Sequence, residues 1–242
     1  MGLEYVDVIY AHRPDPLTPI EEVVRAFNHV LDRGWAFYWG TSEWSARDIE
    51  AAVAAADRLG LVRPLVEQPE YNLVARQRVE VEYAPLYREH GLGLTTWSPL
   101  ASGVLTGKYS GRVLPPGSRL TVEAYKFLLD EKLGDAAWQL DVADALRPLA
   151  AELGCSLAQL SIAWCLANQR VSSVLLGATT RAQLEENLGA LAVAPRLTPE
   201  LLARIAAVAG ARSAPTRTAV EVQVHGVRAV DEVRGEHVAR AP

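Results

Sequence analysis

The sequence predicts an α/β protein with a parallel sheet, and two patterns lead to this fold class. Short apolar runs with strand character alternate with longer segments of helical character along the 242 residues. Strands that alternate with helices pair in parallel through right-handed crossovers. The strand interiors are mostly apolar, as expected for strands that helices cover. The five strands that we expect suit either an open doubly wound sheet or part of a (β/α)8 barrel.

The expected strands and helices follow one another in a regular order. The strands cover residues 5–10, 36–39, 64–68, 92–97 and 172–176. Helices are expected over about 19–33, 46–59, 76–90, 181–191 and 199–209, with two or three more over 121–168. Residues 18–21 (TPIE) and 180–183 (TRAQ) match the capping-box pattern, and Ser45, Ser156 and Thr198 are expected N-caps.

Composition and charge exclude several classes of function. The net charge is −5 with both signs spread along the chain, so no basic stripe suggests nucleic acid. No apolar run is long enough to cross a bilayer, and the N-terminus lacks the pattern of a signal peptide. Cys155 and Cys165 fit neither a redox CxxC motif nor a zinc pair. We therefore expect a cytoplasmic protein with free thiols and no metal site.

Residues 213–242 differ in composition from the rest of the chain. They contain seven valines, balanced charges and no helical period. Residues 220–224 (VEVQV) alternate like a strand but have no evident partner. We expect this segment to be a disordered or opportunistically paired tail.

Polar and ring-bearing residues follow each of the five expected strands. They are His12, Thr41-Ser42, Gln68-Pro69, Trp97-Ser98 and the GATT of 177–180. Each alone could be a loop histidine or an ordinary helix cap. Because the carboxyl ends of parallel strands meet at one edge, where barrel active sites lie, their recurrence predicts a functional site.

Two segments suit a phosphorylated ligand. Residues 177–180 end a strand and lead into a helix, whose N-terminus offers free N–H groups to phosphate. Residues 98–120 show no regular period and hold Lys108 and Arg119 among glycines and prolines, so this segment could close over an anionic cofactor. The alternatives are a plain capped helix and a solvated loop. No complete Walker loop, no GxGxxG after a strand, no HExxH and no GxSxG is present.

Five longer motifs carry a family resemblance. YVDVIYAHRPD, AFYWGTSEWS, VEQPEYNL, TTWSPLASGVLTGKY and SIAWCLANQRVSSVLLGATT, within residues 2–209, resemble the aldo/keto reductase superfamily. The similarity is closest to its voltage-gated potassium channel beta-subunit branch, in particular the plant-like members. The resemblance implies a partial TIM (β/α)8 barrel over residues 1–212, with about five of eight βα units, which correspond to family strands four to eight.

The resemblance also implies an NADPH site. The implied cofactor-binding residues come from the strand ends and the loops that follow them, and they are Ser42, Gln68, Trp97, Ser98, Pro99, Leu100, Ala101, Lys108, Arg119, Gly177, Thr179, Gln183, Glu186 and Asn187. The ring of Trp97 would lie against the nicotinamide. A further contact is implied at Glu43, where mammalian channel subunits carry Arg and the plant-like branch is similar to this chain.

His12 aligns with the family's catalytic histidine, which orients and polarises the substrate carbonyl. The family's Asp, Tyr and Lys belong to strands two and three, which have no counterpart in this chain. We therefore expect an N-terminally truncated reductase, from a misplaced start or reading frame, that turns over poorly because a positioned acid contributes roughly 10²- to 10⁴-fold.

Three functions remain open. The chain could be a reductase of small-molecule aldehydes and ketones, a regulatory beta subunit that binds NADPH and a potassium channel alpha subunit, or an inactive remnant. The resemblance suggests a homotetramer. The charge pattern and the lengths of the apolar runs predict no nucleic-acid partner and no direct membrane insertion.

Overall fold

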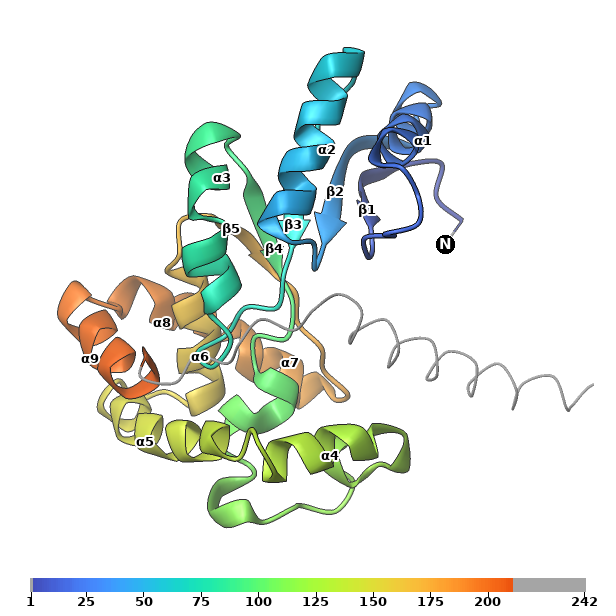
Figure 1. Cartoon of the computed structure of the whole chain (residues 1–242). Coiled ribbons are helices and arrows are strands. Elements are labelled where there is room, and N and C mark those ends of the chain that lie inside the picture. The colour runs from blue at the N-terminus through green and yellow to red at the C-terminus, as the bar shows by residue number, and fades with distance from the viewer. Residues whose placement is uncertain (1, 211–242) are drawn as a thin grey trace, which may run out of the picture.

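A computed structural model describes residues 2–210, in which helices surround one parallel sheet (Figure 1). The strands are β1 (Val6–Ala11), β2 (Ala36–Ser42), β3 (Val66–Gln68), β4 (Gly93–Thr96) and β5 (Val171–Val174). Their order in the sheet follows the chain, and each pairs in parallel with the next. This is the strand order of a (β/α)8 barrel with five strands in place. The predicted fold class, an α/β partial barrel, is confirmed.

The sheet is curled, as a barrel wall is. Tyr10 on β1 hydrogen-bonds through its hydroxyl to Oγ1 of Thr95 on β4, at 2.9 Å, although β2 and β3 separate these strands in the pairing order. The concave face is crowded at Gly40 on β2, where an added Cβ would lie 2.3 Å from the backbone oxygen of Val66 and 3.1 Å from the Tyr10 ring. Only glycine lets the Tyr10 ring lie over β2 at this point.

Nine α-helices are described. They are α1 (Ile20–Asp32), α2 (Ala46–Leu59), α3 (Ala84–Glu89), α4 (Lys126–Leu133), α5 (Trp138–Glu152), α6 (Leu157–Leu166), α7 (Arg181–Leu188), α8 (Ala190–Val193) and α9 (Pro199–Ala209). The convex side of the sheet forms the core with them. Phe27 of α1 stacks on the buried Trp39 of β2, with ring centroids 5.0 Å apart. In Figure 1, α4 and α5 lie at the opposite end of the molecule from α1 and α2.

Most of the predicted helix ends are confirmed. Ser45, Ser156 and Thr198 accept hydrogen bonds from backbone N–H groups three residues on, as N-caps do. Ser156 forms a complete capping box with Gln159. Gly60 ends α2 in the left-handed conformation, with φ 64°.

Three local predictions were wrong. Thr18 does not cap α1, because its hydroxyl donates to Asp15 at 2.7 Å and Pro19 occupies the N-cap. The single helix expected over 76–90 is a π-helical segment η1 (Arg78–Glu82) followed by α3, which begins at Ala84 and has a proline, without an N–H to donate, as its second residue. Residues 98–120 are not wholly irregular.

That segment contains two short 3₁₀ helices, η2 (Ala101–Thr106) and η3 (Ser110–Arg112), and the beginning of a third, η4 (Arg119–Thr121). Two more flank other helices, η5 (Glu123–Tyr125) and η6 (Ala194–Arg196). Positive φ angles at Ser98, Ala101 and Ser102 break the chain into tight turns. Turns this short do not produce a repeating spacing of apolar residues, so the sequence pattern did not predict them.

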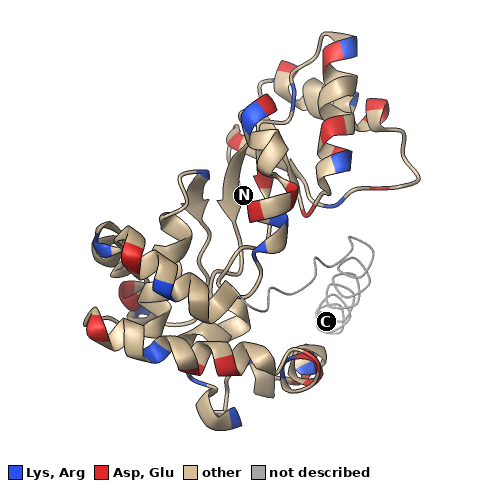
Figure 2. Cartoon of the chain, turned by 60° about the vertical axis from the view of Figure 1, so that its left-hand side comes forward, with Lys and Arg blue, Asp and Glu red and all other residues tan. Residues whose placement is uncertain are grey.

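The proposed tail, residues 213–242, lies outside the described residues, so the division of the chain at 212 stays a prediction. In the described part, Lys and Arg are interspersed with Asp and Glu (Figure 2). No single helix within residues 2–210 has the length and hydropathy of a membrane crossing, although α5 and α6 reach them together across a bend of 89°. Both of these helices are largely buried in the protein.

Candidate functional site

Ser42 and Gln68 form the centre of the site at the carboxyl ends of β2 and β3. They are paired in register, and the Ser42 hydroxyl donates to the Gln68 carbonyl oxygen at 2.9 Å. Both residues stand two positions beyond the Gly40–Val66 pair, so their side chains share the concave face with Tyr10. The structure therefore brings two predicted cofactor residues into direct contact at the mouth of the curled sheet.

Arg13 connects this pair to the predicted catalytic histidine. Its Nη1 donates to the Ser42 hydroxyl at 3.2 Å and to the backbone oxygen of His12. His12 follows β1 directly and is exposed. Partial burial, together with the Arg13 guanidinium, lowers the pKa of His12 from its ordinary value. The imidazole is therefore neutral at pH 7, with one N–H that can donate to a carbonyl oxygen.

A buried ion pair lies beside the third strand end. Glu43, directly after β2, pairs through Oε2 with Arg78 of η1, and their side chains are 6% and 9% exposed. The other oxygen of Glu43 accepts from the indole Nε1 of Trp97 at 2.9 Å and from the backbone N–H of Glu70. Trp97 follows β4 and is partly exposed. The predicted nicotinamide-stacking ring is thus hydrogen-bonded to a carboxylate two strands away.

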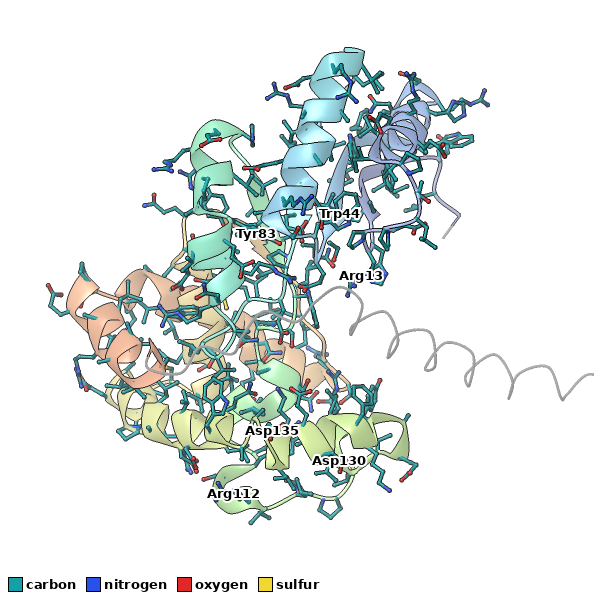
Figure 3. All side chains as sticks on the ribbon, viewed as in Figure 1. Arg13, Trp44, Tyr83, Arg112, Asp130 and Asp135 are labelled. Carbon is teal, nitrogen blue, oxygen red and sulfur yellow. The ribbon has the colours of Figure 1, made fainter. Side chains whose placement is uncertain are left out.

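A second buried carboxyl lies on the convex side of β3. Glu67 accepts from the hydroxyl of Thr41 and from the backbone N–H of Trp44 at 3.2 Å, and the hydroxyl of Tyr83 lies 3.4 Å away. Figure 3 shows Trp44, Tyr83 and Arg13 in one region near the lower ends of β1 and β2. Burial, reinforced by the Glu43 carboxylate, raises the pKa of Glu67 to about 8. Glu67 therefore holds a proton at neutral pH.

The residues after β4 continue from Trp97 into η2. The backbone oxygen of Ser98 accepts from the side-chain amide of Asn72 at 2.9 Å, while Pro99 and Ala101 are buried and Leu100 is partly buried. These four predicted residues form a compact turn next to Trp97, and Ala101 closes it with a backbone hydrogen bond to Ser98 at 3.0 Å.

The two predicted phosphate-binding cations are exposed. Lys108 Nζ lies 5.1 Å from the ring centre of Tyr109, and the Arg119 guanidinium lies 5.5 Å from that of Tyr125. The charged ends of both side chains remain accessible to a ligand. The structure does not place them in contact with Ser42 or Gln68, and the site therefore extends over two separate groups of residues.

The loop after β5 and the start of α7 hold the remaining predicted residues. Gln183 Oε1 accepts from the backbone N–H and the hydroxyl of Thr179, at 2.9 and 3.0 Å. Gly177 and Glu186 are exposed, and Asn187 is buried. The Thr180 hydroxyl accepts from the Gln183 N–H at 3.2 Å, so the predicted N-cap is confirmed. In a complete capping box the Gln183 side chain would accept from the Thr180 N–H, but here it accepts from the Thr179 N–H.

Sequence reasoning missed three polar residues behind the site, the half-buried Arg13 and the buried Arg78 and Tyr83. One signal was present, since Glu67 is a charged residue inside an apolar strand and such a residue must find partners. No signal links Arg78 to Glu43, which is 35 positions earlier in the chain. Among residues 2–210, no three His, Cys, Asp or Glu side chains are grouped to hold a metal ion.

A hollow of about 270 Å³ lies elsewhere, between η2, α5 and α6, and its lining includes Gly107, Arg147 and Ser156. None of the predicted site residues lines it. The strand ends remain the candidate site, because the hydrogen-bonded donors and the aromatic ring converge there. This arrangement can bind an amide group and a flat ring, and can polarise a carbonyl through His12.

Comparison with known proteins confirms the resemblance inferred from the motifs. Residues 1–209 match the family described as "Aldo/keto reductase family". A protein of Arabidopsis thaliana, "Probable voltage-gated potassium channel subunit beta", is 58% identical over 205 residues, which are 85% of this chain and 62% of the relative. A protein of Oryza sativa subsp. japonica with the same description is 57% identical over 218 residues, which are 90% and 65%. The chain thus spans less than two thirds of the length of both relatives.

Proposed function

Because the chain belongs to the aldo/keto reductase family, we propose that its strand-end site binds NADPH and serves the reduction of aldehydes and ketones to alcohols. The family generally uses NAD(P)H. The observation that carries the proposal is the direct contact of Ser42 with Gln68 at adjacent strand ends, with Arg13 bonded to the same hydroxyl. This cluster offers hydroxyl and amide groups at the point where the family binds its cofactor.

The donor set fits the parts of NADPH. Ser42 and Gln68 can hydrogen-bond a carboxamide, and the ring of Trp97 offers a flat face for a nicotinamide. Lys108 and Arg119 supply cations for phosphates, and α7 supplies backbone N–H groups at its start. One more donor is unused, because the buried Nε of Arg13 has no hydrogen-bond partner in the part of the chain that the structure describes.

NADPH, when bound, supplies the hydride. The remaining roles belong to this chain: Trp97 and Gln68 hold the ring, Arg13 orients Ser42, and His12 donates a hydrogen bond to the carbonyl oxygen. The implied Asp, Tyr and Lys of the family are not among these residues. We therefore expect cofactor binding with little turnover, lower by roughly 10²- to 10⁴-fold than with a positioned acid.

The proposal is tested by titrating the full chain with NADPH. We expect saturable quenching of tryptophan fluorescence and a higher melting temperature, since a ligand that binds only the folded state stabilises it. Trp97→Ala should weaken affinity about tenfold through loss of ring stacking. Trp35→Ala is the matched control, because Trp35 is 49% exposed at the opposite end of β2. Absence of quenching and of a thermal shift in the folded chain would refute the proposal.

A second function is supported by the printed names of the two relatives, both described as potassium channel beta subunits. We propose as the alternative that the chain is a cytoplasmic regulatory subunit, assembled as a homotetramer, that binds a channel alpha subunit and senses NADPH. Co-purification with the cytoplasmic domain of a plant potassium channel, without aldehyde-dependent NADPH oxidation, would favour it. Oxidation of NADPH without channel binding would favour the reductase.

A further inference from the structure

Both carboxylate oxygens of Glu43 have hydrogen-bond partners inside the protein. Oε1 accepts from the indole N–H of Trp97 at 2.9 Å and from the backbone N–H of Glu70, while Oε2 pairs with Arg78. The Glu43 side chain is 6% exposed. A carboxylate oxygen accepts about two hydrogen bonds, so Oε1 has no capacity left for a ligand.

The charge of Glu43 is also already balanced. Arg78 comes from η1, so the ion pair joins the end of β2 to the segment that precedes α3. A buried carboxylate facing a ligand without this partner would repel phosphate groups. Glu43 adopts a left-handed backbone conformation, with φ 59°, which a residue other than glycine rarely adopts without a compensating interaction.

Trp97, whose indole N–H donates to Glu43, is also the residue whose ring is available to stack on a ligand. Trp97 is partly exposed, and its backbone is bound on both sides, its N–H to Pro69 at 3.1 Å and its oxygen to the Tyr71 N–H at 3.2 Å. The backbone therefore fixes where Trp97 stands. Its χ angles are restrained by the single side-chain hydrogen bond to Glu43, because an indole has only one donor.

We propose that Glu43 and Arg78 form a positioning pair that orients the Trp97 indole for the cofactor, and that the Glu43 side chain does not contact the cofactor itself. This inference rests on the proposed function for its effect on binding. It assigns to position 43 a role different from the direct contact that the family resemblance implies. It also brings Arg78 into the site, although Arg78 is buried outside the strand ends.

The first experiment needs no cofactor. In ¹⁵N-indole-labelled full chain, the Nε1–H resonance of Trp97, identified by its loss in Trp97→Phe, should exchange slowly with solvent. Glu43→Ala should raise its exchange rate at least about tenfold, because one hydrogen bond is lost. Glu50→Ala, at an exposed glutamate of α2, should leave it unchanged. Equal exchange rates in Glu43→Ala and the wild type would overturn the proposal, whether or not NADPH binds.

The second experiment is a double-mutant cycle read out as NADPH affinity. Trp97→Phe keeps a ring but removes the indole N–H. If Glu43 acts through Trp97, Glu43→Ala should weaken binding about tenfold in the wild type and less than about twofold in Trp97→Phe. An equal loss in both backgrounds would show that Glu43 contacts the cofactor directly and would refute the positioning role.

Removal of one partner from a buried ion pair leaves the other charge stranded, so Glu43→Ala could unfold the chain. The double variant Glu43→Ala/Arg78→Met removes both charges and is expected to fold. It should show the same fast indole exchange and the same loss of affinity. Glu43→Gln keeps an acceptor for the indole and should restore slow exchange, whereas a purely electrostatic role would not be rescued.

Discussion

Glu67 illustrates at the scale of one residue how the fold alters chemistry. Its carboxyl lies behind the site, held by Thr41 and the backbone N–H of Trp44. Burial is the main cause of its raised pKa, the Glu43 carboxylate adds to it, and Arg78 opposes it. Ionisation of Glu67 would place a second negative charge close to the ion pair that holds Trp97. A neutral Glu67 therefore favours the ordered site.

This shift predicts a pH dependence of stability. The pKa of Glu67 rises from 4.5 in an unperturbed carboxyl to about 8 in the fold. Between these values the folded state keeps a proton that the unfolded state releases. The contribution of Glu67 to stability is therefore fully present below about pH 4.5 and is lost as pH rises to about 8, by up to about 1.4 kcal/mol per pH unit.

Urea denaturation at a series of pH values checks this dependence. The side chain introduced by Glu67→Gln cannot ionise. The unfolding free energy of this variant should therefore increase relative to that of the wild type as pH rises from 5 to 8. Glu50→Gln, on an exposed position, supplies the control and should track the wild type. A constant difference between Glu67→Gln and the wild type over this range would mean that Glu67 is ionised throughout.

At the scale of elements, the strands and the longer helices could be predicted because each carries its own pattern. The caps at Ser45, Ser156 and Thr198 depend on residues within one turn, and all three are confirmed. The prediction that Thr18 caps α1 failed for a reason that is also local. The hydroxyl had a competing acceptor in Asp15, and sequence alone does not rank two partners of similar strength.

The site was predictable in part for a related reason. Ser42, Gln68 and Trp97 lie where strands end, which is visible in the alternation of strands and helices. Arg78 is different, because it meets Glu43 only after η1 folds against the end of β2. The break between η1 and α3 was itself missed. The Glu43–Arg78 pair joins residues far apart in the sequence, so no local pattern of residue types predicts it.

At the scale of the whole molecule, the described sheet has two strands that pair on one side only, β1 and β5. Large rings are exposed around the first of them, including Tyr5 at 52%, Phe37 at 60% and Tyr38 at 50%. The rings of Tyr5 and Phe37 meet edge to face at 5.1 Å. Unpaired edges and exposed apolar surface promote association.

We therefore expect the isolated chain to self-associate through the β1 edge of the sheet and the exposed rings around it. Sedimentation velocity at micromolar concentrations should show species larger than a monomer. Tyr38→Lys introduces a charge beside β1, with which Tyr38 is in register through Val8, and should shift the distribution toward monomer. Leu17→Lys changes a residue that is 91% exposed in the loop between β1 and α1, outside the strands, and should not. Identical distributions for the two variants would exclude the β1 edge as the contact.

The pairing of each described strand with the next strand in the chain has a consequence for biosynthesis. As the polypeptide leaves the ribosome, β2 needs only β1, and each later strand needs only the one already made. The sheet can be laid down in the order of translation, one strand and one crossover at a time. Each described strand after β1 therefore finds one partner that has already been synthesised.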